Sequence, residues 1–220
     1  MTFQLETRSL VEAVSEALRE RILTGQIAAG EALTEHGIAT QANVARPTAK
    51  AALERLTHEG LLRRGTNKTA RVPLLNADDV KDLYFSRTFL ERDVVATLAK
   101  RKHVPAAAIS ALRAFDEAAD AEQLTGIVRA DIDFHVALVH ALGSPRVDRM
   151  YNAVIGEAHL CMAQVQAHRL LSASTIAAEH QAIVDAIKAG RKNAADLLVH
   201  HLESARDRLV GYVEADQRQL

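Results

Sequence analysis

The 220-residue sequence has one cysteine, no tryptophan and only 4% aromatic residues. Cys161 cannot form an intramolecular disulfide by itself, and the opening residues MTFQLETRSL lack the apolar run of a signal peptide, so we expect a reducing, cytoplasmic environment. The scarcity of aromatic side chains argues against the base-stacking platforms of proteins that bind single strands or RNA. Because no run approaches the ~18 consecutive apolar residues of a membrane span, we expect no membrane partner.

An excess of one charge is also missing, because 27 Lys and Arg oppose 28 Asp and Glu. A basic surface for nucleic acid must therefore be local. One such cluster lies within positions 43–71, where the acidic residues are Glu54 and Glu59 and the basic ones are Arg46, Lys50, Arg55, Arg63, Arg64, Lys68 and Arg71. The apolar content of 48% suffices for two modest cores, so we expect two domains and keep duplex DNA as a candidate partner.

The N-terminal third carries three helical patterns followed by a basic hairpin. Apolar residues recur at helical spacing over positions 10–22, Thr34 can cap a short second helix, and a third can begin at Arg46 or Pro47. The segment LLRRGTNKTARV then holds two short strand-compatible runs around a turn. Helices, turn and hairpin in this order predict a winged helix-turn-helix over residues 1–73.

The third helix has hydrogen-bond donors where a recognition helix meets the edges of DNA bases. Arg46, Thr48 and Lys50 stand in its first turns, and Lys68 at the tip of the hairpin could meet phosphate or the minor groove. A solvated basic face on a small helical domain explains any one of these residues equally well. The correct order of helix, turn, helix and basic hairpin favours DNA binding for the set.

From Asn76 onward the sequence shows only helical periodicity. Breaks that predict about six helices occur at Pro105, Gly126, Gly143 with Pro145, Ser172 and Gly190. The side chains expected to line the first of these helices are Phe85, Phe89, Leu90, Val94 and Leu98. Short connections favour an antiparallel bundle over residues 74–220. The predicted fold class is therefore mainly α, a winged helix-turn-helix followed by an all-α bundle.

The run DIDFH is the most informative motif of this second half. Asp131 and His135 lie four residues apart, so on a helix both side chains project from one face. A carboxylate and imidazoles that converge inside a bundle form a site for a divalent metal ion, and imidazole favours zinc or nickel over magnesium. A lone histidine is more often a surface or satisfied core residue, so the prediction needs further ligands from other helices.

The segment ILTGQIAAGEALTEHGIATQANVARPTAKAALERLTHEGLLRR resembles the GntR family of transcriptional regulators. The resemblance implies that Arg46 and Lys50 occupy two basic DNA-reading positions and that Asn67 lies at the wing tip. It also places His36 where an Arg of some relatives contacts the DNA backbone. The family opens its recognition helix with Ser-Arg-Thr-Pro, whereas residues 45–48 here read Ala-Arg-Pro-Thr and lack the capping hydroxyl. Double-stranded operator DNA is the implied partner, with the operator sequence left open.

From Asp79 onward the chain resembles the FCD domain, the helical ligand-binding domain of the largest, FadR-type GntR subgroup. The resemblance rests on the motifs YFSRTFLE, DIDFHVAL, EHQAIVDAIKAG and HHLE. It implies that His180 and a histidine near the chain end complete the metal site with Asp131 and His135.

The last metal ligand is either His200 or His201. Residues 197, 201, 205 and 209 repeat every four positions on one helical stripe, which favours His201. The spacing of the family reaches Leu202, one residue further, which implies a one-residue deletion near Gly190. Both histidines stay open as candidates.

Arg87, in the motif YFSRTFLE, is the candidate cation for binding an effector. It could also pair with Glu91, four residues on, and the two roles are compatible. The family resemblance implies a small organic-acid effector, which could coordinate the metal directly. We expect a homodimer, paired through the helical domains, that places two recognition helices in successive major grooves.

Two rival functions are a helical-bundle metalloenzyme and a regulator whose metal is purely structural. The sequence has no pair of Glu-x-x-His motifs, no nucleophile elbow and no Gly-rich phosphate loop. A catalytic role would also leave the winged motif unexplained. We therefore expect a regulator and not an enzyme.

Overall fold

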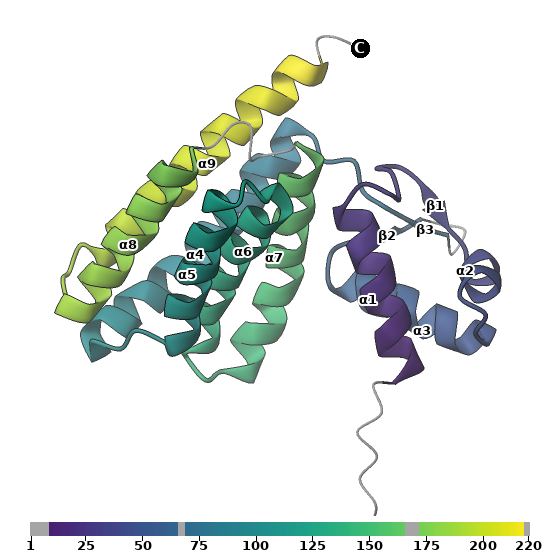
Figure 1. The fold of residues 1–220 in the computed structure, drawn as a ribbon, viewed down its shortest axis with the longest axis horizontal. Coiled ribbons are helices and arrows are strands. Elements are labelled where there is room, and N and C mark those ends of the chain that lie inside the picture. The colour runs from purple at the N-terminus through teal and green to yellow at the C-terminus, as the bar shows by residue number, and fades with distance from the viewer. Residues whose placement is uncertain (1–8, 66–68, 166–171, 218–220) are drawn as a thin grey trace, which may run out of the picture. The chain divides into compact units, whose positions relative to one another are not determined.

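The structure is a computed structural model that describes residues 9–65, 69–165 and 172–217. The chain divides between Leu74 and Leu75 into two compact units (Figure 1). Within the described ranges, no helix has the length and apolar character needed to cross a bilayer. The assignment of DNA binding to residues 1–73, and of effector and metal binding to residues 74–220, stays a prediction.

The first unit is a winged helix-turn-helix. Its described residues form the elements α1 (Leu10–Leu23), β1 (Ala32–Leu33), α2 (Glu35–Gln41), α3 (Arg46–His58), β2 (Arg63–Arg64) and β3 (Ala70–Arg71). The strands make an antiparallel sheet in the order β1-β3-β2, with Ala32 and Arg63 both opposite Arg71. The predicted three helices followed by a hairpin are confirmed, and β1 adds a third strand to the wing.

Local sequence explains where α2 and α3 begin. The Thr34 hydroxyl accepts a hydrogen bond from the Gly37 backbone N–H at 3.0 Å, which caps α2. Asn43 turns the chain with φ at 50°, a left-handed conformation that asparagine tolerates. α3 begins after Ala45, which makes no side-chain cap, and Pro47 occupies its first turn.

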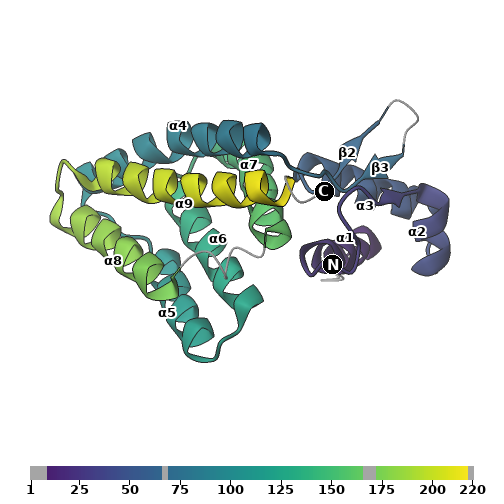
Figure 2. The same ribbon diagram turned by 90° about the horizontal axis from the view of Figure 1, so that it is seen from above.

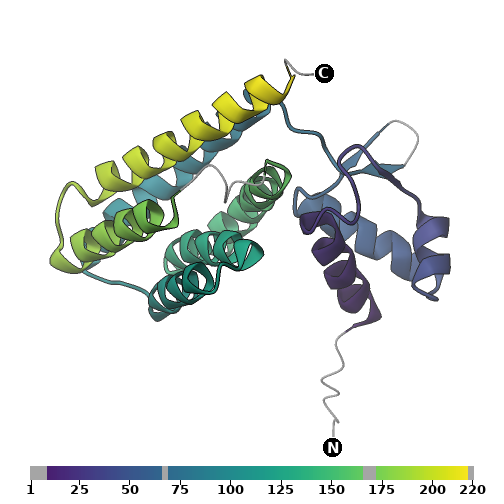
Figure 3. The same cartoon turned by 45° about the horizontal axis from the view of Figure 1, so that its top comes forward.

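The second unit is the predicted bundle of six helices, counted over its described residues. They are α4 (Ala77–Arg101), α5 (Ala106–Asp120), α6 (Leu124–His140), α7 (Pro145–Gln164), α8 (Ala173–Ala189) and α9 (Ala194–Gln217). The two long helices α4 and α9 lie side by side (Figures 2 and 3). α6 packs against α4, α5 and α7, so its side chains face the middle of the bundle.

One predicted helix break is wrong. The chain leaves the helix at Ala121, three residues after the buried Ala118, and re-enters it at Leu124. Gly126 therefore lies inside the first turn of α6 rather than at the break. A Cβ atom there would come within 3.0 Å of the Ala118 Cβ, so this glycine permits the close approach of α5 and α6.

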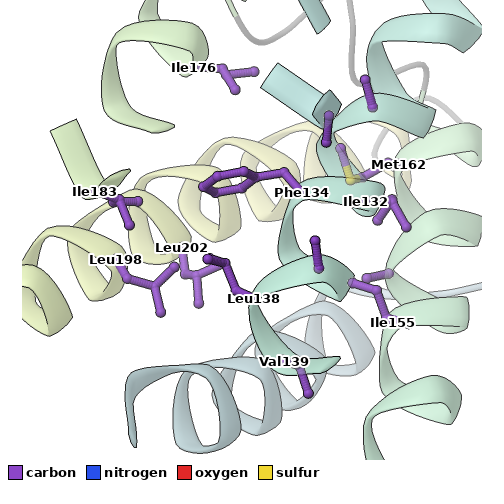
Figure 4. Packing of buried hydrophobic residues seen from close by; sticks show 14 of the residues in the cluster. Ile132, Phe134, Leu138, Val139, Ile155, Met162, Ile176, Ile183, Leu198 and Leu202 are labelled. Carbon is purple, nitrogen blue, oxygen red and sulfur yellow. The ribbon is translucent and has the colours of Figure 1, made fainter. Parts of the chain in front are cut away.

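The core of the bundle surrounds Phe134. Its ring points from α6 toward Ile183 of α8 and toward the leucines at positions 198 and 202 of α9 (Figure 4). All four side chains are fully buried. Each buried aliphatic side chain of this kind contributes about 1.5–3 kcal/mol relative to an exposed one, so this cluster fixes α6 against α8 and α9.

The prediction of which side chains of α4 face the core is partly wrong. Phe85 and Phe89 are 68% and 73% exposed. In their place, Arg87 and Glu91 point inward and are almost completely buried. α4 is thus turned so that Arg87 and Glu91 face the core, where Glu91 contacts His135 of α6.

Candidate metal centre

Four predicted metal ligands meet in the interior of the second unit. Asp131 and His135 come from α6, His180 from α8 and His201 from α9, and all four are buried. Each offers one ligand atom, and these atoms all lie within 4.8 Å of one another. His200 is exposed, so the structure places His201 and not His200 in the cluster.

The spacing of the ligand atoms suits one ion. The Nε2 atom of His201 lies 3.2 Å from that of His180 and 3.3 Å from that of His135. The Nε2 atom of His180 lies 3.4 Å from Asp131 Oδ1. Ligands bound to zinc at about 2.0–2.1 Å in a tetrahedron stand about 3.3–3.4 Å apart, so these three separations fit a shared metal ion.

Two of the imidazoles form hydrogen bonds with carboxylates. His135 Nδ1 donates to Glu91 Oε2 at 2.6 Å, and His201 Nδ1 donates to Glu179 Oε2 at 2.7 Å. Because the proton of each neutral ring is then on Nδ1, the Nε2 lone pairs of both rings face the cluster. Lone pairs at this distance repel each other unless a cation lies between them.

The protonation states favour such a cation. Burial lowers the pKa of His135, and it lowers the pKa of His180 well below the ordinary value, with further lowering from His201 and His135. Burial opposes ionisation of Glu91, yet Arg87 and His135 hold the pKa of its carboxyl well below the usual range. Imidazoles that burial keeps neutral are donors suited to a borderline divalent metal.

His180 is held by aromatic packing. Its ring stacks on Phe134 with centroids 4.1 Å apart and planes 23° from parallel, and Phe115 meets it edge-on at 5.9 Å. His180 Nδ1 is buried and has no hydrogen-bond partner among the described residues. The third imidazole is therefore fixed by shape.

Arg87 lies beside the cluster and is only partly satisfied. Its Nε donates to Glu91 Oε1 at 2.9 Å, and the hydroxyl of Tyr151 donates to the same oxygen at 2.8 Å. Its guanidinium carbon lies 5.0 Å from the centre of the Tyr84 ring. The Nη2 atom is buried without a hydrogen-bond partner in the described parts of the chain.

A pocket joins Arg87 to the candidate ligands. Asp131, His201 and Arg87 all line it. The other residues that line this pocket are Tyr84, Met162, Ile176, Glu179, Ser204, Ala205 and Arg208. Two candidate metal ligands and a buried cation therefore lie around one pocket.

The predicted DNA-reading residues lie on the first unit. Arg46 and Lys50 of α3 and His36 of α2 are exposed, and Thr48 is half-buried. Lys50 Nζ lies 3.8 Å from Glu54 Oε1, a weak surface pairing. The predicted wing-tip residues, Asn67 and Lys68, lie outside the described residues.

Sequence reasoning missed three residues of the site. Glu91 was expected only as a partner of Arg87, although it also contacts His135. Glu179 precedes His180 directly, and its contact with His201 on another helix has no local signal. Tyr151 of α7 belongs to no recognisable sequence motif, and its contact with Glu91 of α4 forms only in the folded bundle.

Two protein families match this chain. Residues 10–72 match the bacterial regulatory proteins of the gntR family. Residues 82–204 match the FCD domain. One match lies in each unit and covers most of it.

Curated relatives match almost the whole chain. The HTH-type transcriptional repressor NanR of Citrobacter rodentium is 28% identical over 223 residues, which cover 91% of this chain and 85% of the relative. The HTH-type transcriptional regulator BphR of Paraburkholderia xenovorans is 26% identical over 213 residues, covering 90% and 84%.

Solved structures share the fold. A GntR transcriptional regulator from Rhodococcus sp. RHA1 superposes with a TM-score of 0.79 at 29% identity, covering 92% of this chain and 98% of that one. The E. coli protein McbR/YncC superposes with a TM-score of 0.70 at 20% identity, covering 95% and 99%. The second likeness concerns the fold alone.

Proposed function

The chain belongs to the gntR family of bacterial regulatory proteins and has an FCD domain, and from this premise we propose that a small organic acid, bound at a metal centre in the second unit, controls its affinity for operator DNA. The observation that carries the proposal is the Nη2 atom of Arg87. It is a buried donor without a partner among the described residues, and Arg87 lines the same pocket as the candidate ligands Asp131 and His201. A buried polar atom in this condition costs about 1–3 kcal/mol, and a bound carboxylate would satisfy it.

The metal would be held by Asp131, His135, His180 and His201. Three imidazole nitrogens and one carboxylate oxygen suit zinc or nickel better than magnesium, which prefers oxygen ligands. When bound, a divalent ion would supply positive charge, and a carboxylate oxygen of the effector would be a fifth ligand, a coordination number to which zinc sometimes expands.

The buried charges favour a monoanion. Metal binding requires neutral imidazoles and an Asp131 carboxylate, and with Glu91 ionised and Arg87 positive this buried set carries one net negative charge before an ion binds. A divalent ion would leave this buried set with one net positive charge. Since uncompensated buried charge is costly, one carboxylate group on the effector would balance the site, with Arg87 Nη2 as its donor.

On the first unit, Arg46 would read a guanine edge in the major groove, and Lys50 and Thr48 would reach bases or phosphates. His36 would contact the DNA backbone. Both basic side chains are exposed on α3. Asn67 and Lys68 would meet the backbone or minor groove from the wing. Effector binding can change operator affinity only if the effector binds more tightly to one arrangement of the protein than to another.

The active form would be a homodimer paired through the helical units. Phe85 and Phe89 lie one turn apart on α4 and are largely exposed, and contiguous exposed apolar surface typically marks an interaction site. A twofold pair of helix-turn-helix units reads two half-sites about one helical turn of DNA apart.

The central experiment is a thermal-shift screen of small organic acids on zinc-loaded protein, followed by titration of duplex DNA selected by the protein from a randomised pool. We expect at least one monocarboxylate to raise Tm and change the affinity for the selected DNA. Arg87→Lys keeps the charge but loses the planar donor pair, and should weaken that response without releasing zinc. If the metal raises Tm but no acid changes either Tm or DNA affinity, the metal is purely structural. If the protein converts an acid into a product, it is a metalloenzyme.

A further inference from the structure

We propose that Glu91 and Glu179 are positioning residues of the metal centre, each fixing one imidazole so that its Nε2 atom faces the ion. The inference rests on the proposed metal centre and extends it to residues outside the ligand set. Neither carboxylate supplies a ligand atom to the cluster. Each instead accepts the Nδ1 proton of one ligand, His135 for Glu91 and His201 for Glu179.

A carboxylate on the far nitrogen of a histidine does two things for a metal. It selects the tautomer whose Nε2 lone pair is free, and it raises the basicity of that lone pair. The contacts at 2.6 and 2.7 Å are in the range of charge-assisted hydrogen bonds. Both rings therefore present their lone pairs to the centre of the cluster before any ion arrives.

Glu91 is held more rigidly than Glu179. It is 2% exposed, and its two oxygens receive hydrogen bonds from His135, Arg87 and Tyr151, which lie on three different helices. Glu179 is 24% exposed at its side chain, and His201 is its only hydrogen-bond partner among the described residues. Solvent screens the second contact, so Glu91 should contribute more to metal affinity.

His180 provides an internal contrast. No carboxylate accepts from its Nδ1, and its ring is fixed by stacking on Phe134. Two ligands are thus oriented by charge and one by packing. The chain also offers a matched control in Glu203 of α9, which is exposed and outside the cluster.

The test measures zinc affinity by competition with a chromophoric chelator for the wild type and for Glu91→Gln, Glu179→Gln and Glu203→Gln. A loss of about 10–100-fold is typical when an outer-shell partner is removed. We expect a loss in that range for Glu91→Gln, a smaller loss for Glu179→Gln and none for Glu203→Gln. The visible absorption of cobalt-substituted protein should shift in the first two variants, because the ring orientation changes, and a purely structural role would leave it unaltered.

The outcomes separate two failures. If wild-type protein does not bind zinc or cobalt, both the proposed metal centre and this inference are contradicted. If wild-type protein binds and both Glu91→Gln and Glu179→Gln keep the same affinity and the same cobalt spectrum, the inference alone is overturned. If Glu91→Gln does not fold, the zinc affinity and cobalt spectrum of Glu179→Gln, a change at a partly exposed side chain, test the inference.

Discussion

His135 of α6 and His201 of α9 face each other with their Nε2 atoms 3.3 Å apart, their ring centroids 5.3 Å apart and their planes 18° from parallel. Both rings donate from Nδ1 to a carboxylate, so in the neutral form of each ring the Nε2 atom is an acceptor with no proton to offer the other. Two buried acceptors in this arrangement gain by binding a cation, and the stability of the second unit should depend on one.

Removal of the metal should lower thermal stability. A ligand that binds only the folded state stabilises it by about 2.7 kcal/mol at a free concentration of 100 times Kd. We expect zinc or nickel to raise Tm and a chelator to reverse the rise, measured by circular dichroism. His201→Ala should abolish this response, whereas the exposed neighbour His200→Ala should keep it. Equal responses in the two variants would contradict the ligand assignment.

Loss of the Tyr151 hydroxyl should destabilise the fold without changing any charge. The hydroxyl donates to buried, ionised Glu91 at 2.8 Å, and hydrogen bonds to charged groups contribute about 1.5–3 kcal/mol. Tyr151→Phe should lower the free energy of unfolding in urea by about that amount. Tyr212→Phe, at an exposed tyrosine of α9, should leave it unchanged. If Tyr151→Phe leaves the free energy of unfolding unchanged, the Tyr151 hydroxyl is not needed to stabilise buried Glu91.

Arg46→Ala should weaken specific DNA binding. Arg46 is exposed at the start of α3, where a bidentate contact with guanine discriminates by roughly 1–3 kcal/mol. Titration of selected duplex DNA by fluorescence anisotropy at fixed salt should show a loss of that size for the selected sequence. Arg191→Ala removes the same charge from an exposed position of the second unit and serves as the control. An unchanged affinity would remove Arg46 from the reading set.

Phe89→Glu should separate the two copies of the proposed homodimer. A charge on an apolar contact between copies must be buried without a partner, which is strongly unfavourable. Light scattering after gel filtration should give the mass of a dimer for the wild type and of a monomer for the variant. Leu124→Glu, at another exposed apolar residue, should remain dimeric. A dimeric Phe89→Glu protein would place the contact elsewhere.

Most of the fold could be predicted from sequence because its signals are local. Thr34 and Ser172 cap helices through their own side chains, and helical periodicity marks each long segment. β1 could not be predicted, since two residues show no period and their partner β3 lies far along the chain. Gly126 misled because its small size serves packing between helices and not a turn.

The site was predictable only in part. Asp131 and His135 share a helical face by spacing alone, whereas His180 and His201 needed the family resemblance. The orientation of α4 was mispredicted because apolar periodicity assigns Phe85 and Phe89 to the core. A buried charged pair, Arg87 and Glu91, overrides that preference, and such violations of local patterning are expected at functional sites.

The candidate metal ligands and several residues of the pocket wall lie on different helices, and this separation affects how related proteins can diverge. The four candidate ligands come from α6, α8 and α9, while α4 and α7 contribute Tyr84, Arg87 and Met162 to the wall of the pocket. Substitutions at Tyr84 or Met162 would reshape the space offered to a ligand and leave the ion's donor atoms untouched. Related proteins could therefore come to bind different small molecules through changes at a few residues of the pocket wall, while the four candidate metal ligands stay the same.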